Sequence, residues 1–211
     1  MAARLFSRIV RIAAVVAAAA SLSACGVNSI PTAEENAKAK WADVQSQYQR
    51  RSDLIPNLVA TVKGYAKQEQ DTLTKVTEAR ARATSIQISA DDVTNPEKVA
   101  AFQKAQGELS QGLGRLLATT EAYPDLKSNE NFLALQSQLE GTENRIAVAR
   151  RDYNEAVRGY NVTIRTFPAV IAAKVIYGAK PMVPFAAAAG AEAAPTISFD
   201  GPAAAAKPDA K

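Results

Sequence analysis

The sequence feature that most constrains the fold is a long apolar pattern between residues 128 and 167. Apolar or small side chains recur there at alternating steps of three and four, the spacing of one helix face. At 1.5 Å per residue, such a helix is a rod of about 58 Å. One isolated helix cannot bury this stripe, so partner helices must run along it. The pattern stops at Pro168, and its positions are Phe132, Leu135, Leu139, Thr142, Ile146, Ala149, Tyr153, Ala156, Tyr160, Ile164 and Phe167.

Three shorter stripes of the same kind precede it. The first follows a helix start at Thr32 and continues to Tyr48, the second covers residues 58–83, and the third covers residues 95–120. Asn95 is followed by Pro96, which is a strong helix start. Four stripes with short connections predict an all-α protein, an antiparallel bundle of about four long helices.

Connections and ends of the bundle are predicted from breaks in this pattern. Pro56 disfavours a helical residue before it, so we expect a tight turn or sharp kink at residues 52–56. The polar residues 85–94 are expected to form a loop. The apolar residues 169–177 are expected to cap one end of the bundle. Trp41, Tyr48, Tyr65, Tyr153 and Tyr160 lie on the stripes and are predicted to pack in the core.

Residues 1–24 have the pattern of a bacterial secretion signal, with Arg4, Arg8 and Arg11 before an apolar run from Ile12 to Leu22. The sole cysteine, Cys25, follows Leu-Ser-Ala, which resembles the lipobox of bacterial lipoproteins. That resemblance implies acylation of the thiol and a permanent membrane anchor. In that case, residues 25–31 would be a short lipidated tether. A plain cleaved signal and a retained membrane helix are the alternatives.

The side of the membrane follows from the same segment. Secretion would carry the bundle out of the cytoplasm, facing the periplasm in a bacterium with two membranes. Gly26 follows the cysteine in place of the aspartate that retains lipoproteins in the inner membrane, which mildly favours the outer membrane.

Composition excludes several classes of function. Removing residues 1–24 leaves 22 basic and 21 acidic residues, so no nucleic-acid partner is predicted. The absence of histidine excludes Ser-His-Asp and Cys-His nucleophile systems and histidine-ligated zinc. We expect no enzyme, metal or cofactor. Residues 178–211, rich in Ala and Pro, are predicted to be a mostly disordered tail in which Thr196–Phe199 could dock on the bundle or a partner.

Two candidate sites are proposed from sequence, each with a structural alternative. Asp53, Leu54, Ile55, Pro56 and Asn57 could form an apolar turn that contacts a partner. Arg151, Arg158 and Arg165 recur every seven residues and could bind an anionic ligand, although a solvated helix face has the same pattern.

A weaker candidate lies in the middle of the last helix. Glu140 and Glu143 could hold a cation. The alternative is a plain helix surface that a neighbour approaches closely at Gly141, because glycine weakens a helix.

Several of these segments also resemble the LemA family. The resemblance covers roughly residues 33–177 and implies a membrane-attached, mainly helical protein whose bundle of long helices faces away from the cytoplasm. The family has no established catalytic residues to transfer, and this chain departs from members with an N-terminal membrane helix by having a lipobox. The matching segments are residues 50–59, 62–66, 77–80, 123–127, 131–132, 139–150, 153–154, 160–161 and 167–168.

These observations favour a lipid-anchored, non-enzymatic scaffold or adaptor that contacts another envelope protein. The alternative is a binding module for an anionic lipid head group or glycan that uses the arginine line. Self-association into a homo-oligomer is open, because a long apolar stripe serves it as well as it serves intramolecular packing.

Overall fold

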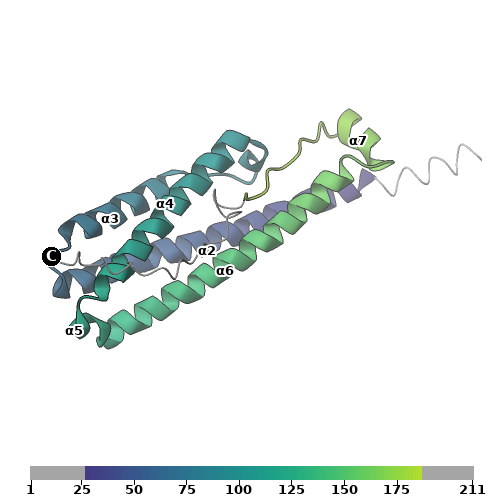
Figure 1. Ribbon diagram of the computed structural model, residues 1–211. Coiled ribbons are helices and arrows are strands. Elements are labelled where there is room, and N and C mark those ends of the chain that lie inside the picture. Colours follow the sequence, from purple (N-terminus) through teal and green to yellow (C-terminus); the bar gives the residue numbers. More distant parts are fainter. Residues whose placement is uncertain (1–26, 187–211) are drawn as a thin grey trace, which may run out of the picture.

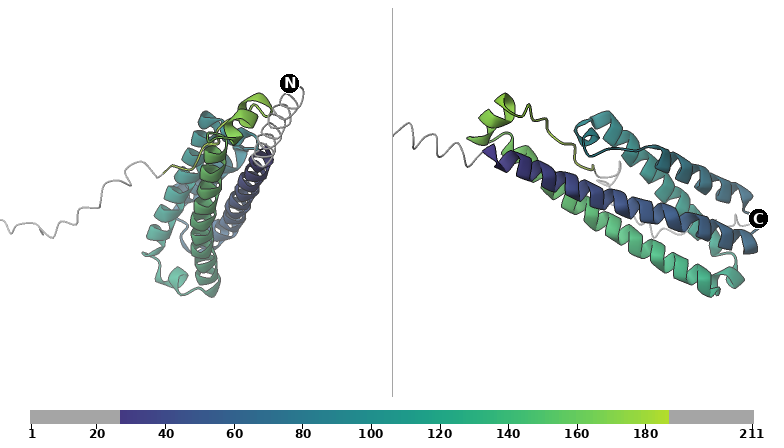
Figure 2. Two further views of the ribbon diagram at one scale, coloured as in Figure 1. Left: turned by 90° about the vertical axis from the view of Figure 1, so that its right-hand side faces the viewer. Right: turned by 180° about the vertical axis from the view of Figure 1, so that it is seen from behind.

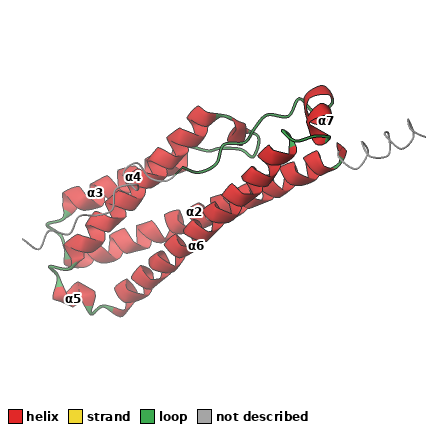
Figure 3. Cartoon of the chain, turned by 45° about the vertical axis from the view of Figure 1, so that its right-hand side comes forward, coloured by secondary structure: helices red, strands yellow, loops and turns green. Residues whose placement is uncertain are grey.

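A computed structural model describes residues 27–186 and contains helices but no strand in that range. Two long helices, α2 and α6, lie side by side and antiparallel, and α3 and α4 form a second antiparallel pair along them (Figures 1 and 3). The predicted all-α bundle is confirmed. Its elements are α2 (Ser29–Tyr65), α3 (Gln70–Ser85), the 3-10 helix η1 (Asp92–Thr94), α4 (Pro96–Thr120), α5 (Pro124–Lys127), α6 (Glu130–Thr163) and α7 (Ala169–Val175).

The predicted break at residues 52–56 is wrong, because α2 continues straight through Pro56. Proline has no N–H to donate to the carbonyl four residues earlier, which is that of Ser52. In this fold Arg80 of α3 donates from Nε to the Ser52 carbonyl oxygen at 2.8 Å. Ile55 and Leu58 are buried on either side of the proline. A tertiary hydrogen bond and core packing therefore stabilise the helix that local preference would interrupt.

The chain reverses ten residues later than predicted. α2 ends at Tyr65, and Ala66 N–H bonds back to the Val62 carbonyl at 2.8 Å. The predicted helix over residues 58–83 is thus divided between the end of α2 and α3. Tyr65 lies at this reversal with 45% of its surface exposed, so its predicted place in the core is also wrong.

The starts of α4 and α6 follow from their capping residues. Asn95 accepts hydrogen bonds from the backbone N–H groups of Glu97 and Lys98, as the sequence predicts. Asn129 Oδ1 accepts from Phe132 N–H at 3.0 Å and begins α6 there. With 34 residues, α6 is shorter than predicted and shorter than α2, which has 37.

Buried aromatic rings fill the half of the bundle near α7. The Trp41 ring centroid lies 5.5 Å from that of Phe102, 5.3 Å from that of Tyr153 and 5.7 Å from that of Phe185. The core of this half is therefore built from large rings.

A Cβ added at Gly141 would meet no neighbouring atom within 4 Å, so the close crossing expected there is absent. Gly141 therefore does not mark a close approach between α6 and another helix.

α7 packs against one end of the bundle, and the chain then returns along α6 (Figures 1 and 2). We call residues 179–186 the strap. Met182 and Phe185 of the strap are buried, so the predicted disordered tail does not begin at residue 178. At the other end of the described chain, α2 begins at Ser29, inside the predicted tether. The signal, Cys25 and Thr196–Phe199 lie outside the described residues.

Candidate functional site

Two asparagines of α6 hold the main chain of the strap. Asn161 donates from Nδ2 to the Met182 carbonyl at 2.8 Å and accepts from Met182 N–H at 2.9 Å. Asn154 makes the same pair with Phe185, at 3.0 Å and 2.8 Å. We call these two asparagines the clamp. Each amide bonds only to backbone groups of the strap. The clamp therefore binds the main chain of an extended segment and makes no hydrogen bond to its side chains.

The spacing of the clamp matches an extended strap. Seven helical residues place Asn154 and Asn161 about 10.5 Å apart along α6. Three residues of a polyproline II chain, from Met182 to Phe185, span about 9.3 Å. Side chains three apart in such a chain lie on one face, so Met182 and Phe185 both enter the core. Pro184, which has no N–H, is exposed between them.

Other residues complete the surface on which the strap lies. We call this surface the groove; it consists of the clamp, Tyr153, Val93, Arg150 and Gln103. Tyr153 donates from its hydroxyl to the Val183 carbonyl at 3.0 Å, and burial raises the pKa of this hydroxyl, which keeps its proton for donation. Val183 N–H donates to the Val93 carbonyl at 2.9 Å. At the strap's end, the Ala186 carbonyl accepts from Arg150 Nη2 at 3.1 Å, and Ala186 N–H donates to Gln103 Oε1 at 3.3 Å. The groove therefore draws on α4, α6 and the residue Val93.

The predicted arginine line is only partly brought together. Arg151 forms an ion pair with Asp152 at 3.2 Å. Arg158 and Arg165 are exposed, have no ion pair among the described residues, and lie beside the strap. They line a depression of about 530 Å³ that Pro184 also borders. The sequence placed Asn154 and Asn161 between these arginines but did not indicate that they bind the chain's own backbone.

The second predicted site, residues 53–57, is not a loop at a bundle end. These residues lie inside α2, where Ile55 is buried and Leu54 is half-buried. Asp53 is exposed and accepts a hydrogen bond from Gln49 at 2.8 Å. Pro56 and Asn57 are exposed on the helix surface. The predicted apolar contact turn does not exist, because the reversal of the chain occurs elsewhere.

A buried arginine that the sequence analysis did not single out connects three helices. Arg51 of α2 is 1% exposed and donates from Nη1 to Glu143 Oε1 at 2.9 Å and to Ser110 Oγ at 2.7 Å. Its Nη2 donates to Gln106 Oε1, and its guanidinium lies 5.0 Å from the centre of the Tyr48 ring. A buried charge with this many partners stabilises a specific register. The sequence did contain a signal for this burial, because Arg51 lies three residues after Tyr48 and so continues the apolar stripe of the first helix.

The same ion pair changes the interpretation of the carboxylates on α6. Glu143 is engaged by Arg51, and Glu140 accepts a hydrogen bond from Gln136 at 3.0 Å. Within residues 27–186, no group of three or more acidic or cysteine side chains is arranged to hold a metal ion. Glu143 is thus a half-exposed partner of the buried Arg51, and Glu140 lies on the helix surface.

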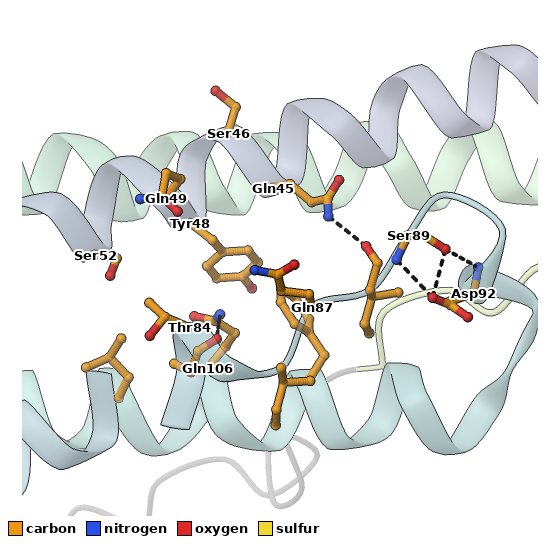
Figure 4. Close-up of a pocket in the computed structure, with 15 residues that line it drawn as sticks. Gln45, Ser46, Tyr48, Gln49, Ser52, Thr84, Gln87, Ser89, Asp92 and Gln106 are labelled. Carbon is orange, nitrogen blue, oxygen red and sulfur yellow. Dashed lines mark hydrogen bonds between the residues drawn. The ribbon is translucent and has the colours of Figure 1, made fainter. Parts of the chain in front are cut away.

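A pocket of about 620 Å³ with a mixed polar and apolar lining lies between α2, α4 and the loop that joins α3 to η1 (Figure 4). Its walls carry the amides of Gln45, Gln49 and Gln87, and the buried hydroxyl of Ser52 has no hydrogen-bond partner. Asp92 lies at its rim, where a hydrogen bond from Lys98, supported by Ser89, lowers the pKa of the carboxyl to about 2. The walls offer hydrogen-bonding groups rather than a nucleophile with a base.

The comparison with protein families agrees with the helical geometry. The LemA family model matches residues 40–199, which cover most of the chain. The chain belongs to the LemA family. The resemblance seen in the sequence is thereby confirmed, and the match includes the strap as well as the bundle.

Named relatives of this LemA chain come from three bacteria. Magnetosome protein MamQ 2 of Paramagnetospirillum magneticum is 27% identical over 157 residues, 67% of this chain and 58% of the relative. Magnetosome protein MamQ of Magnetospirillum gryphiswaldense is 26% identical over the same shares. Protein LemA of Metamycoplasma hominis is 27% identical over 59% of this chain and 52% of the relative. The chain thus spans a little over half the length of these relatives.

These names and the family description denote no enzyme, which is compatible with a non-enzymatic protein. Within the described part of the chain, none of the helices combines the length and the hydrophobicity of a membrane span.

Proposed function

We propose that this chain is a lipid-anchored, non-enzymatic scaffold or adaptor of the bacterial envelope, and that the groove around the strap is its contact site. Acylated Cys25 would hold the protein on a membrane, with the bundle facing the periplasm and the outer membrane favoured over the inner. The partner would be another envelope protein that presents an extended segment.

The observation that carries this proposal is the clamp. Asn154 and Asn161 bind main-chain groups, so the groove accepts any extended segment with the right spacing of buried anchors. Recognition of preformed extended chains by this geometry is a recurring mode of peptide binding. The strap covers the groove with residues from the end of the described chain, and a partner segment would take its place by exchange.

Photo-crosslinking in living cells tests the proposal. A photoreactive amino acid replaces Gln103, at the groove's end, and the adducts are identified by mass spectrometry. Phe185→Ser releases the strap and leaves the clamp intact, whereas Asn154→Leu with Asn161→Leu removes the clamp. We expect adducts to one foreign envelope protein that increase with Phe185→Ser and disappear with the double leucine variant.

The controls separate groove binding from general association. A probe at Leu133, exposed near the start of α6, should not give the same dependence on the strap. Pro184→Ser changes an exposed strap residue that donates no hydrogen bond and should leave the adducts unchanged. Adducts that are equal in all of these chains would make the groove purely structural, and self-adducts alone would replace the adaptor with a homo-oligomer.

A second candidate function is binding of an anionic lipid head group or glycan. The exposed Arg158 and Arg165 line one depression, which favours this function, and Arg151 lies about two helical turns before Arg158 on α6. Reversing these three charges should abolish binding to acidic lipid or glycan, and added salt should weaken it. Arg145→Glu, on the same helix, is the matched control. Binding that survives the triple reversal would rule this function out.

A further inference from the structure

α7 places its small side chains against the bundle and its large ones in solvent. Ala169, Ala172 and Ala173 are buried in the core, whereas Ile171 is 58% exposed and Val175 is 80% exposed. A helix held by core packing normally does the reverse. The outward side of α7 is therefore more apolar than the side that contacts the protein.

Neighbouring residues enlarge this apolar surface. Phe167, just before α7, is 80% exposed, and Ile176 and Tyr177, just after it, are also exposed. Of the nine exposed large hydrophobic residues in the described chain, these three and two from α7 lie within eleven consecutive positions. Contiguous exposure of this kind marks a surface for a partner or a membrane. We call it the α7 face: Phe167, Ile171, Val175, Ile176 and Tyr177.

The charges in the segment that carries the α7 face are all positive. Residues 161–186 contain no aspartate or glutamate, and Arg165, Lys174 and Lys180 are exposed. Apolar side chains surrounded by basic ones suit the interface of an anionic bilayer. A second copy of the chain fits less well, because a two-fold contact would bring the same basic residues together.

The α7 face lies at the end of the bundle where α2 begins (Figures 1 and 3). Cys25 precedes Ser29 by four residues, a reach of at most about 14 Å. A lipid on Cys25 would therefore hold this end of the bundle, and not the end with α5, beside the bilayer.

We propose that the α7 face inserts into the interface of an anionic phospholipid bilayer and gives the bundle a second attachment to the membrane. This goes beyond the proposed function, because it defines how the bundle sits on its membrane and which surfaces remain for a partner. With α7 in the bilayer interface, the long axes of α2 and α6 point away from the membrane, and the α5 end is the most distant.

Fluorescence on vesicles tests the insertion. An environment-sensitive fluorescent amino acid replaces Ile171 in the full chain, which is purified from membranes and reconstituted into vesicles of phosphatidylethanolamine and phosphatidylglycerol. We expect a blue shift of the emission and quenching by lipid-borne spin labels. The same probe at Leu133, similarly exposed at the far end of α6, should show neither.

The charge requirement is tested in the same system. Arg165→Glu, Lys174→Glu and Lys180→Glu together should remove the blue shift at position 171, and phosphatidylcholine vesicles should reduce it. Emission at position 171 that equals that of the Leu133 probe, or a blue shift without lipid quenching that grows with protein density, would overturn the proposal. Failure of the Cys25 anchor is distinguishable, because the mass of the purified chain shows directly whether Cys25 carries a lipid.

Discussion

The hydrogen bond from Arg80 to the Ser52 carbonyl makes a quantitative prediction about α2. This carbonyl is the acceptor that Pro56 leaves without an intrahelical donor, and Ser52 is buried. Arg80→Ala should leave it without a protein donor and lower the free energy of unfolding by about 1–3 kcal/mol. Pro56→Ala should restore the intrahelical donor and raise this free energy by about 2 kcal/mol, the proline penalty of ~3 less the ~1 that proline contributes through the unfolded chain.

The two substitutions should not be additive. In the Pro56→Ala background, the new N–H at position 56 satisfies the Ser52 carbonyl, so Arg80→Ala should cost about 1 kcal/mol less than it costs alone. Guanidinium unfolding followed by the fluorescence of Trp41, the sole tryptophan and a buried one, measures all four chains. Arg82→Ala is the matched control, because Arg82 is exposed and forms only surface ion pairs. An equal cost of Arg80→Ala in both backgrounds would refute this account of α2.

Three further predictions concern other parts of the chain. Arg51→Met should lower the free energy of unfolding by about 1–3 kcal/mol in the same assay, since it leaves the buried Gln106 side chain without its donor, whereas the half-exposed Glu143 is solvated by water instead. Because the folded pKa of Asp92 lies below its ordinary value of 3.8, its bond to Lys98 should be present above that pH and lost as the pH falls toward 2. The protection of the amides at the start of α4, measured relative to their intrinsic exchange rates at each pH, should fall over this window, and Asp92→Asn should remove the dependence. Cys25→Ser, combined with Arg165→Glu, Lys174→Glu and Lys180→Glu to weaken the α7 attachment, should move the protein from the membrane to the soluble fraction of lysed cells, and a retained membrane helix would leave it in place.

Local signals predicted the helical elements that depend on local chemistry. Asn95 followed by Pro96 predicted the start of α4, and the apolar stripe predicted most of α6. The proline at position 56 was a misleading signal, because its local cost is offset by a donor from another helix, 24 positions later in the sequence. No property of residues 52–56 alone could indicate that compensation.

The candidate sites divide in the same way. Arg151, Arg158 and Arg165 were predicted to lie on one helix face, and all three are exposed, since periodicity determines which face a residue occupies. Binding of an anion by them stays a prediction. The strap could not be predicted, because its segment has too few large apolar residues to fold alone. It is held by partners elsewhere in the fold, among them Asn154 and Asn161, which bond to its backbone, and the core that accepts Phe185.

The sequence by itself determined the helical class, the membership of the LemA family and the near-neutral charge of the chain after residue 24, because periodicity, motifs and composition are properties of the chain alone. Only the tertiary structure decided that α2 passes through Pro56, that the buried Arg51 pairs with Glu143, and that the strap lies in a groove on α6. Each of these depends on a partner more than twenty residues away. Such contacts form only once the helices have packed, so no local pattern specifies them.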